Sequence, residues 1–138
     1  MSAFTIISEI NTTESSLKSL FDFLSDFKNF KTILPEDKVE NFEYTDTECS
    51  FNIKGVTPMT IKKVEVKPHE FILFSSQGLA KFNFSLKVFF IGDALQKGEC
   101  KVELMGDLNP FIKAMAEKPL NALTNTMSLK LSQLNLDK

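Results

Sequence analysis

The end of this 138-residue chain predicts one long amphipathic helix, over residues 109–134, and its position constrains the whole fold. Asn109 suits the N-cap and Pro110 the first helical position. Apolar residues then recur at helical spacing over about half of the cylinder, and Pro119 removes one backbone hydrogen bond and bends the helix. Because almost no helix is expected over 38–107, the apolar side of this last helix has to cover a sheet.

Alternating apolar and polar residues predict the strands of that sheet. In the clearest run, the even positions from Phe82 to Val88 are apolar and the odd positions up to Lys87 are polar, so one face is buried and the other is wet. Short breaks between the strands, such as those at Gly55 and Gly92, favour antiparallel hairpins. Strands are expected at residues 39–45, 48–54, 58–67, 70–77, 80–91 and 97–107.

The segment before these strands predicts one further strand and two short helices. The strand covers residues 3–10, and the polar residues 11–14 supply the cap of a helix that continues to about Ser25. Asp26 caps a second short helix, which ends before Pro35. The apolar residues of this second helix are Phe27, Phe30 and Ile33.

The composition is that of one globular domain over residues 1–138, with an apolar fraction of 43% and a net charge of −2. There are 14 phenylalanines and no tryptophan, so most aromatic rings are expected inside. All 16 basic residues are lysine, which leaves no arginine for bidentate binding of phosphate or guanine. We therefore expect no nucleic-acid partner, and the net charge gives no attraction to anionic lipid.

No apolar stretch approaches the length of a membrane span, and the first residues lack the pattern of a signal peptide. We expect a cytoplasmic protein without stable membrane insertion, in which Cys49 and Cys100 stay reduced. The sequence indicates no particular oligomeric state.

The order of these elements is one strand, two short helices, six strands and a long helix, which is the helix-grip arrangement. Together with residues 21–30 (FDFLSDFKNF) followed by Leu34 and Pro35, it resembles the START-like, or SRPBCC, superfamily, which includes the Bet v 1-like proteins. Within that superfamily it resembles small bacterial members of the polyketide cyclase/dehydrase-like kind, many of which have a tryptophan where Phe30 stands here.

This resemblance covers nearly the whole chain and implies an α+β fold. About seven curved antiparallel strands would wrap around the C-terminal helix, with an apolar cavity between sheet and helix. The fold hosts carriers, receptors and enzymes, so the fold alone does not settle the function.

The implied cavity would be lined by inward-facing residues of the sheet and by the apolar side of the last helix. Tyr44 is expected to point inward with Phe42, and its hydroxyl would need a hydrogen-bond partner. The same side chains could instead pack against the helix and fill the space, and alternation does not separate these two readings. The candidate ligand-binding residues are Phe42, Tyr44, Phe51, Phe74, Phe82, Phe84, Leu86, Leu104, Met115, Pro119, Leu123 and Met127.

Candidate catalytic and metal-binding residues are few. His69 is the only histidine, and its place in a turn after Pro68 is typical of an exposed, passive side chain. Cys49 and Cys100 do not form a metal-binding or redox spacing. We expect no catalytic residue, no metal and no cofactor. The strand lysines, Lys63 among them, are expected on the outer face of the sheet.

Three functions remain open. The sequence favours a binding protein for a small apolar ligand, lipid-like or polycyclic, in a cavity between sheet and C-terminal helix. The first alternative is a polyketide cyclase/dehydrase-like enzyme, which needs an acid or base in that cavity. The second alternative is a protein-interaction module with a filled core, whose contact surface would lie around Phe27, Phe30 and Pro35.

Overall fold

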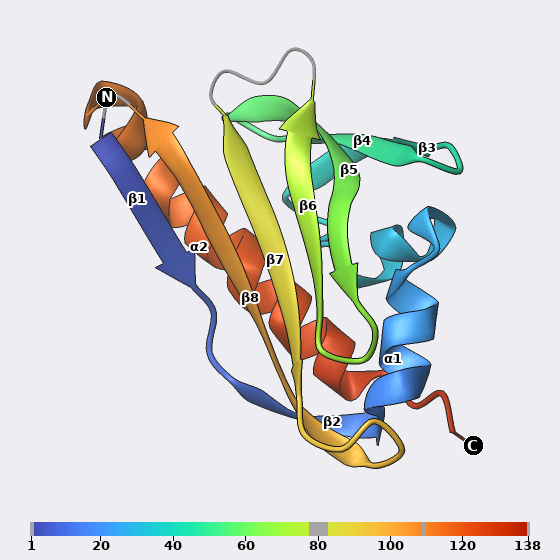
Figure 1. Cartoon of the computed structure of the whole chain (residues 1–138). Helices are drawn as coiled ribbons and strands as arrows, with labels where there is room; N and C mark the ends of the chain where they lie inside the picture. Colours follow the sequence, from blue (N-terminus) through green and yellow to red (C-terminus); the bar gives the residue numbers. More distant parts are fainter. Residues whose placement is uncertain (1, 78–82, 109, 138) are drawn as a thin grey trace.

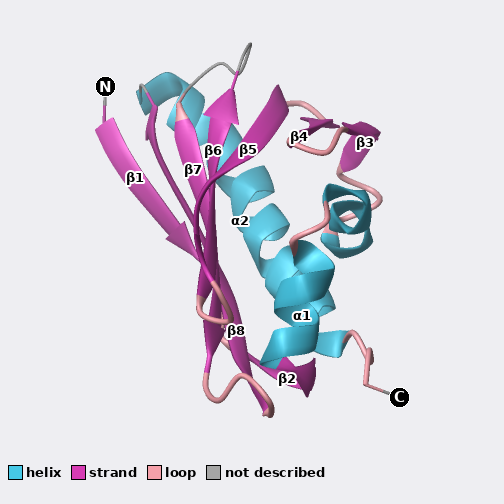
Figure 2. Cartoon of the chain, turned by 45° about the vertical axis from the view of Figure 1, so that its right-hand side comes forward, coloured by secondary structure: helices cyan, strands magenta, loops and turns pink. Residues whose placement is uncertain are grey.

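The computed structural model describes residues 2–77, 83–108 and 110–137, and in it the helices lie on one face of an antiparallel sheet (Figure 1, Figure 2). This arrangement confirms the predicted α+β helix-grip fold. In chain order the elements are β1 (Ser2–Ile7), β2 (Asn11–Ser16), α1 (Leu17–Leu24), the 3-10 helix η1 (Phe27–Ile33), β3 (Val39–Tyr44), β4 (Glu48–Ile53), β5 (Thr57–Lys67), β6 (Phe71–Gln77), β7 (Phe84–Ile91), β8 (Lys97–Leu108) and α2 (Pro110–Gln133).

The sheet is open and contains eight strands within the described ranges. Their order is β1-β8-β7-β6-β5-β4-β3, and β2 also pairs with β8. The count is one more than the resemblance implies, because the N-terminal extended segment is divided into two strands that pair with successive parts of β8 (Figure 1).

The prediction that the first helix starts at residues 11–14 is wrong, because these residues belong to β2. Helix α1 follows Ser16, whose side chain accepts a hydrogen bond from the Ser19 amide and so provides the N-cap. In β2 the hydroxyl of Thr13 accepts a hydrogen bond from the Gly98 amide of β8, at 2.9 Å. Pairing with a distant strand therefore outweighs the local capping preference of this segment.

Helix α2 packs against β8, β2, β1 and η1, and its two halves differ in burial. Before Pro119, Ala116 is buried, whereas Phe111 is 79% and Met115 is 47% exposed. After Pro119, the buried apolar residues are Leu120, Leu123, Met127 and Leu131. The second half of α2 thus closes the core, and most described side chains of the first half face solvent.

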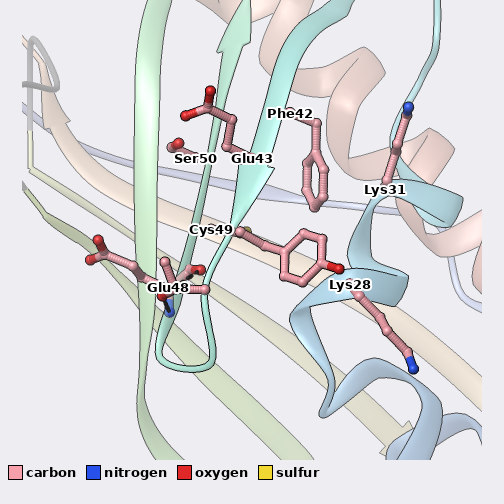
Figure 3. A pocket seen from close by; sticks show the side chains of 9 residues that line it. Lys28, Lys31, Phe42, Glu43, Glu48, Cys49 and Ser50 are labelled. Carbon is pink, nitrogen blue, oxygen red and sulfur yellow. Dashed lines mark hydrogen bonds between the residues drawn. The ribbon is translucent and has the colours of Figure 1, made fainter.

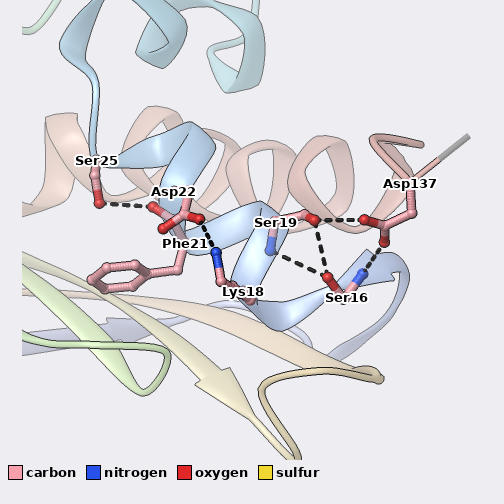
Figure 4. Close-up of polar contacts among 7 residues, drawn as sticks. All are labelled: Ser16, Lys18, Ser19, Phe21, Asp22, Ser25 and Asp137. Carbon is pink, nitrogen blue, oxygen red and sulfur yellow. Dashed lines mark hydrogen bonds and ion pairs between the residues drawn. The ribbon is translucent and has the colours of Figure 1, made fainter.

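Hydrogen bonds tie the C-terminal part of the chain to the strands and helix at the N-terminal end. The Ser128 hydroxyl in α2 donates to the Glu9 carbonyl at 3.0 Å. Beyond α2, the Asp137 carboxylate accepts from the Ser19 hydroxyl and from the Ser16 amide, each at 2.5 Å (Figure 4). These two bonds lower the pKa of Asp137. The chain end therefore packs across β2 and the start of α1.

A bulge in the edge strand β3 determines which of its side chains face the helices. The register shifts between Glu40 and Glu43, and Asn41 adopts a φ of 59°, a left-handed conformation that asparagine tolerates better than most residues. Tyr44 pairs with the buried Cys49, so the two side chains lie on the same face of the sheet, the inner one. Tyr44 nevertheless stays 53% exposed, since it lies at the end of an edge strand.

Lys63, predicted on the outer face, lies on the inner one. It pairs with Phe74, which has no exposed surface, and its ammonium donates to the Ser25 carbonyl at 2.6 Å. The ammonium also lies 5.5 Å from the centre of the Phe27 ring. Lys63 therefore connects β5 to the C-terminal end of α1.

Candidate functional site

Phenylalanine rings fill the space between η1 and the sheet. Phe30 has no exposed surface, and the centre of its ring lies 5.4 Å from that of Phe74 and 6.3 Å from that of Phe51. The Phe27 ring lies 5.9 Å from that of Phe74. These are the distances of packed aromatic pairs. Phe27, Phe30 and Pro35 are therefore buried, and the prediction of an exposed contact surface around them is wrong.

The predicted ligand-binding residues divide into two groups. Phe42 and Pro119 are half-buried, Tyr44 and Met115 are about half exposed, and Phe82 lies outside the described residues. The structure brings the others together in one buried cluster, in which no side chain is more than 4% exposed: Phe51, Phe74, Phe84, Leu86, Leu104, Leu123 and Met127.

A large hollow lies beside η1. Its volume is about 680 Å³, and it is a groove between η1 and the β3–β4 hairpin (Figure 3). We call it the hairpin groove. Its volume is in the range of small-molecule sites. It is lined by Lys28, Lys31, Phe42, Glu43, Tyr44, Thr45, Glu48, Cys49 and Ser50.

Aromatic rings and lysines line opposite walls of the hairpin groove. The rings of Phe42 and Tyr44 lie 6.1 Å apart on β3. Lys28 and Lys31 lie one turn apart on η1, because three residues complete a turn of a 3-10 helix. Figure 3 shows Phe42 and both lysines on one side of the hairpin and Glu43 on the other. The inner side of the groove thus combines apolar surface with positive charge.

The thiol of Cys49, in the groove lining, is only 1% exposed. Burial raises its pKa to about 12, and the neighbouring Glu48 carboxylate contributes further. Burial likewise raises the pKa of Cys100 to about 11. Because the thiolate is the nucleophilic form, neither cysteine is suited to nucleophilic catalysis.

His69 is a packing residue at another hollow. Its ring meets that of Phe21 edge-on, with 5.3 Å between the ring centres, and its backbone has a φ of 64°. The hollow beside it, of about 560 Å³, is also lined by Glu70, whose carboxylate pairs with Lys67 at 3.4 Å. Among the hydrogen bonds of the described residues, none gives the His69 ring a partner for proton transfer.

The described part of the interior is poor in groups that could do chemistry. Its buried polar side chains all carry hydroxyls: Ser8, Thr13, Ser15, Thr124, Ser128 and Ser132. No group of three or more His, Cys, Asp and Glu side chains in residues 2–77, 83–108 and 110–137 is placed to hold a metal ion. Across those same residues, no helix is both long and apolar enough to cross a membrane.

Sequence reasoning missed the two lysines of the groove, although a signal was present. Apolar residues recur at every third position of η1, and a lysine follows each of the first two, at Lys28 and Lys31. A period of three is that of a 3-10 helix, in which residues three apart share a face. The pattern therefore indicates one apolar face and an adjacent basic face on the same short helix.

Solved structures of low sequence identity share this fold. Norcoclaurine synthase from Thalictrum flavum, in complex with dopamine and hydroxybenzaldehyde, matches with a TM-score of 0.68 and 13% identity, over 95% of this chain and 85% of that one. The Zhui aromatase/cyclase from Streptomyces sp. R1128 matches with a TM-score of 0.66 and 12% identity, over 94% of each chain. A START superfamily protein from Mycobacterium smegmatis matches with a TM-score of 0.64 and 11% identity, over 94% of each.

These similarities define the class of fold, a helix-grip sheet closed by a C-terminal helix. More specifically, the chain has the START-like, or SRPBCC, fold that the sequence predicted. No protein-family model matches the sequence, and none of the curated proteins matches it either.

Proposed function

We propose that this chain binds a small, largely apolar molecule in the hairpin groove. The observation that carries the proposal is the pair of rings of Phe42 and Tyr44, which lie on the inner face of an edge strand and remain partly exposed at a groove of about 680 Å³. Partly exposed aromatic surface in a concave site of this size gains free energy when an apolar ligand covers it.

In this proposal the ligand lies on the outer side of η1, and not between the sheet and α2 as the sequence suggested. Phe30 and its neighbours occupy the inner side of η1, whereas the groove on the other side is open. The fold neighbours support a small-molecule role, since one was solved with dopamine and hydroxybenzaldehyde and another is an aromatase/cyclase.

The polar groups of the interior and of the groove support ligand binding more than cyclase or dehydrase chemistry. Such an enzyme needs an acid or base of suitable pKa beside its substrate. The buried polar groups of the described interior are hydroxyls, and the buried thiol at the groove, Cys49, has a pKa raised to about 12. Neither is suited to transferring protons near neutral pH, and the two carboxylates of the groove lining, Glu43 and Glu48, lie on the opposite side of the hairpin from the Phe42 ring.

A fluorescence titration with the uncharged apolar dye Nile red tests the proposal. We expect Phe42→Ala to weaken binding about tenfold, since the variant removes an aromatic side chain from the contact. Phe111→Ala serves as the control, because Phe111 is a 79% exposed ring on α2 away from the groove. If Phe111→Ala weakens binding and Phe42→Ala does not, the ligand binds at α2 and the proposal is wrong.

The filled interior also favours a second candidate function, that of a protein-interaction module. The first half of α2 presents Phe111 and Met115, which are 79% and 47% exposed. Exposed apolar side chains that lie together on one helix are suited to a protein contact. Failure of Nile red to bind, combined with self-association of the wild type that Phe111→Asp abolishes in sedimentation velocity, would support this function over ligand binding.

A further inference from the structure

Lys31 supplies a positive charge that the described residues leave unpaired. Lys28, one turn earlier on η1, lies 3.7 Å from the Asp26 carboxylate. Lys31 is exposed and makes no ion pair with any residue of 2–77, 83–108 or 110–137. An anion that enters the hairpin groove therefore meets Lys31 without displacing an internal partner.

The two acidic residues that line the hairpin groove, Glu43 and Glu48, lie away from this lysine. Figure 3 shows Glu43 and Glu48 on the opposite side of the hairpin from Lys31. The Glu40 carboxylate accepts a hydrogen bond from the Asn52 side chain at 3.0 Å, which holds it along the hairpin. The groove is therefore apolar on the wall that carries the Phe42 ring and positive on the facing wall that carries Lys31, and the space between them complements a negative charge.

A second hollow, of about 360 Å³, continues the groove past Phe42. Lys31 and Phe42 line both hollows, so they lie where the two meet. Apart from Phe42, the apolar lining of the second hollow comes from Leu34, Pro35 and Val39. Three exposed polar residues line this second hollow as well: Glu36, Glu40 and Asn41. The two hollows thus offer a cluster of apolar side chains on one side of Lys31 and the open groove on the other.

We infer that the ligand of this site is an amphipathic anion, with its charged group at Lys31 and its apolar chain along Phe42 into the second hollow. The inference rests on the proposed function and adds the chemical class of the ligand. A neutral apolar molecule of the same length gains the apolar contacts and lacks the charge interaction with Lys31.

Isothermal titration calorimetry with decanoate and decanol separates the two contributions. The wild type is expected to bind decanoate roughly fivefold more tightly than decanol, the effect of one partly exposed ion pair. Lys31→Gln should remove this preference, so that the variant binds decanoate and decanol about equally. The matched control is Lys118→Gln, since Lys118 is an exposed lysine of α2 that lines neither hollow, and it should retain the preference.

The possible outcomes are distinct. Equal affinity for decanoate and decanol, with both weakened by Phe42→Ala, would overturn the inference of an anion and leave the proposed function in place. An equal loss of preference in Lys31→Gln and Lys118→Gln would also overturn it, because net charge would then explain the preference. If neither ligand binds, the inference and the proposed function both fail.

Discussion

The two faces of the short helix η1 differ in burial. Phe27, Phe30 and Ile33 recur every third residue and are buried against the sheet, whereas Lys28 and Lys31 are exposed at the hairpin groove. The first face fills the interior with aromatic rings, and the second leaves a groove open on the other side. The seven residues of this 3-10 helix therefore separate a packed interior on one face from an open groove on the other.

Phe30→Ala should have the largest effect on stability, because it removes the ring at the centre of the aromatic packing between η1 and the sheet. Phe30 has no exposed surface and contacts the rings of Phe51 and Phe74. We expect a loss of about 3–5 kcal/mol in the free energy of unfolding, measured by urea denaturation. The control Phe111→Ala should change it by less than about 0.5 kcal/mol. A similarly small loss for Phe30→Ala would mean that the interior is not packed around this ring.

Lys63→Met tests whether the hydrogen bond from Lys63 to the C-terminal end of α1 stabilises the fold. The ammonium of Lys63 donates to the Ser25 carbonyl at 2.6 Å, and a bond from a charged donor contributes about 1.5–3 kcal/mol. Methionine keeps most of the apolar contact with Phe27, so we expect a net loss of about 1–2 kcal/mol in urea denaturation. Lys62→Met alters the exposed neighbour and should be near neutral. Equal losses in the two variants would contradict an inner-face role for Lys63.

Cys49 of β4 lines the hairpin groove and yet is buried, so its thiol reports where the dry interior ends. Its pKa is about 12 in the folded protein against 9.0 for an ordinary thiol, so above pH 9 the unfolded chain loses this proton while the folded chain keeps it. Stability must therefore fall as pH rises, by about 1 kcal/mol from this thiol between pH 9 and 10. Urea denaturation at the two pH values should give a shallower fall for Cys49→Ala than for the wild type. Parallel pH profiles would show that water from the groove reaches the thiol.

The sequence predicts those parts of the fold whose pattern is local and long. An apolar stripe predicts the 24 residues of α2, whereas the predicted N-cap, Asn109, lies outside the described residues. The alternation in β7 places Phe84, Leu86 and Val88 on the buried face. The segment of β2 was misassigned, because its hydroxyls bond to partners far along the chain, such as Gly98 for Thr13. Polar residues that cap helices locally can equally pair with a distant strand.

The candidate site was harder to predict than the fold. Alternation correctly placed Tyr44 on the inner face, but its exposure depends on β3 being the edge strand and on the bulge at Asn41. Whether Phe51 and Phe74 lined a cavity or filled it depended on how deeply the ring of Phe30 reaches between sheet and helix. That depth follows from packing in three dimensions, and no spacing in the sequence encodes it.

The most direct test of the account is a map of backbone amide shifts as decanoate is titrated into the ¹⁵N-labelled protein. The account predicts that the largest shifts fall on Lys31, Phe42 and Tyr44, at the hairpin groove. The amides of Phe74 and Leu123, on the filled side, should move little. Large shifts at Phe74 and Leu123 with little change at Phe42 would place the ligand between the sheet and α2, and would contradict the central claim that η1 closes the interior and leaves the groove as the binding site.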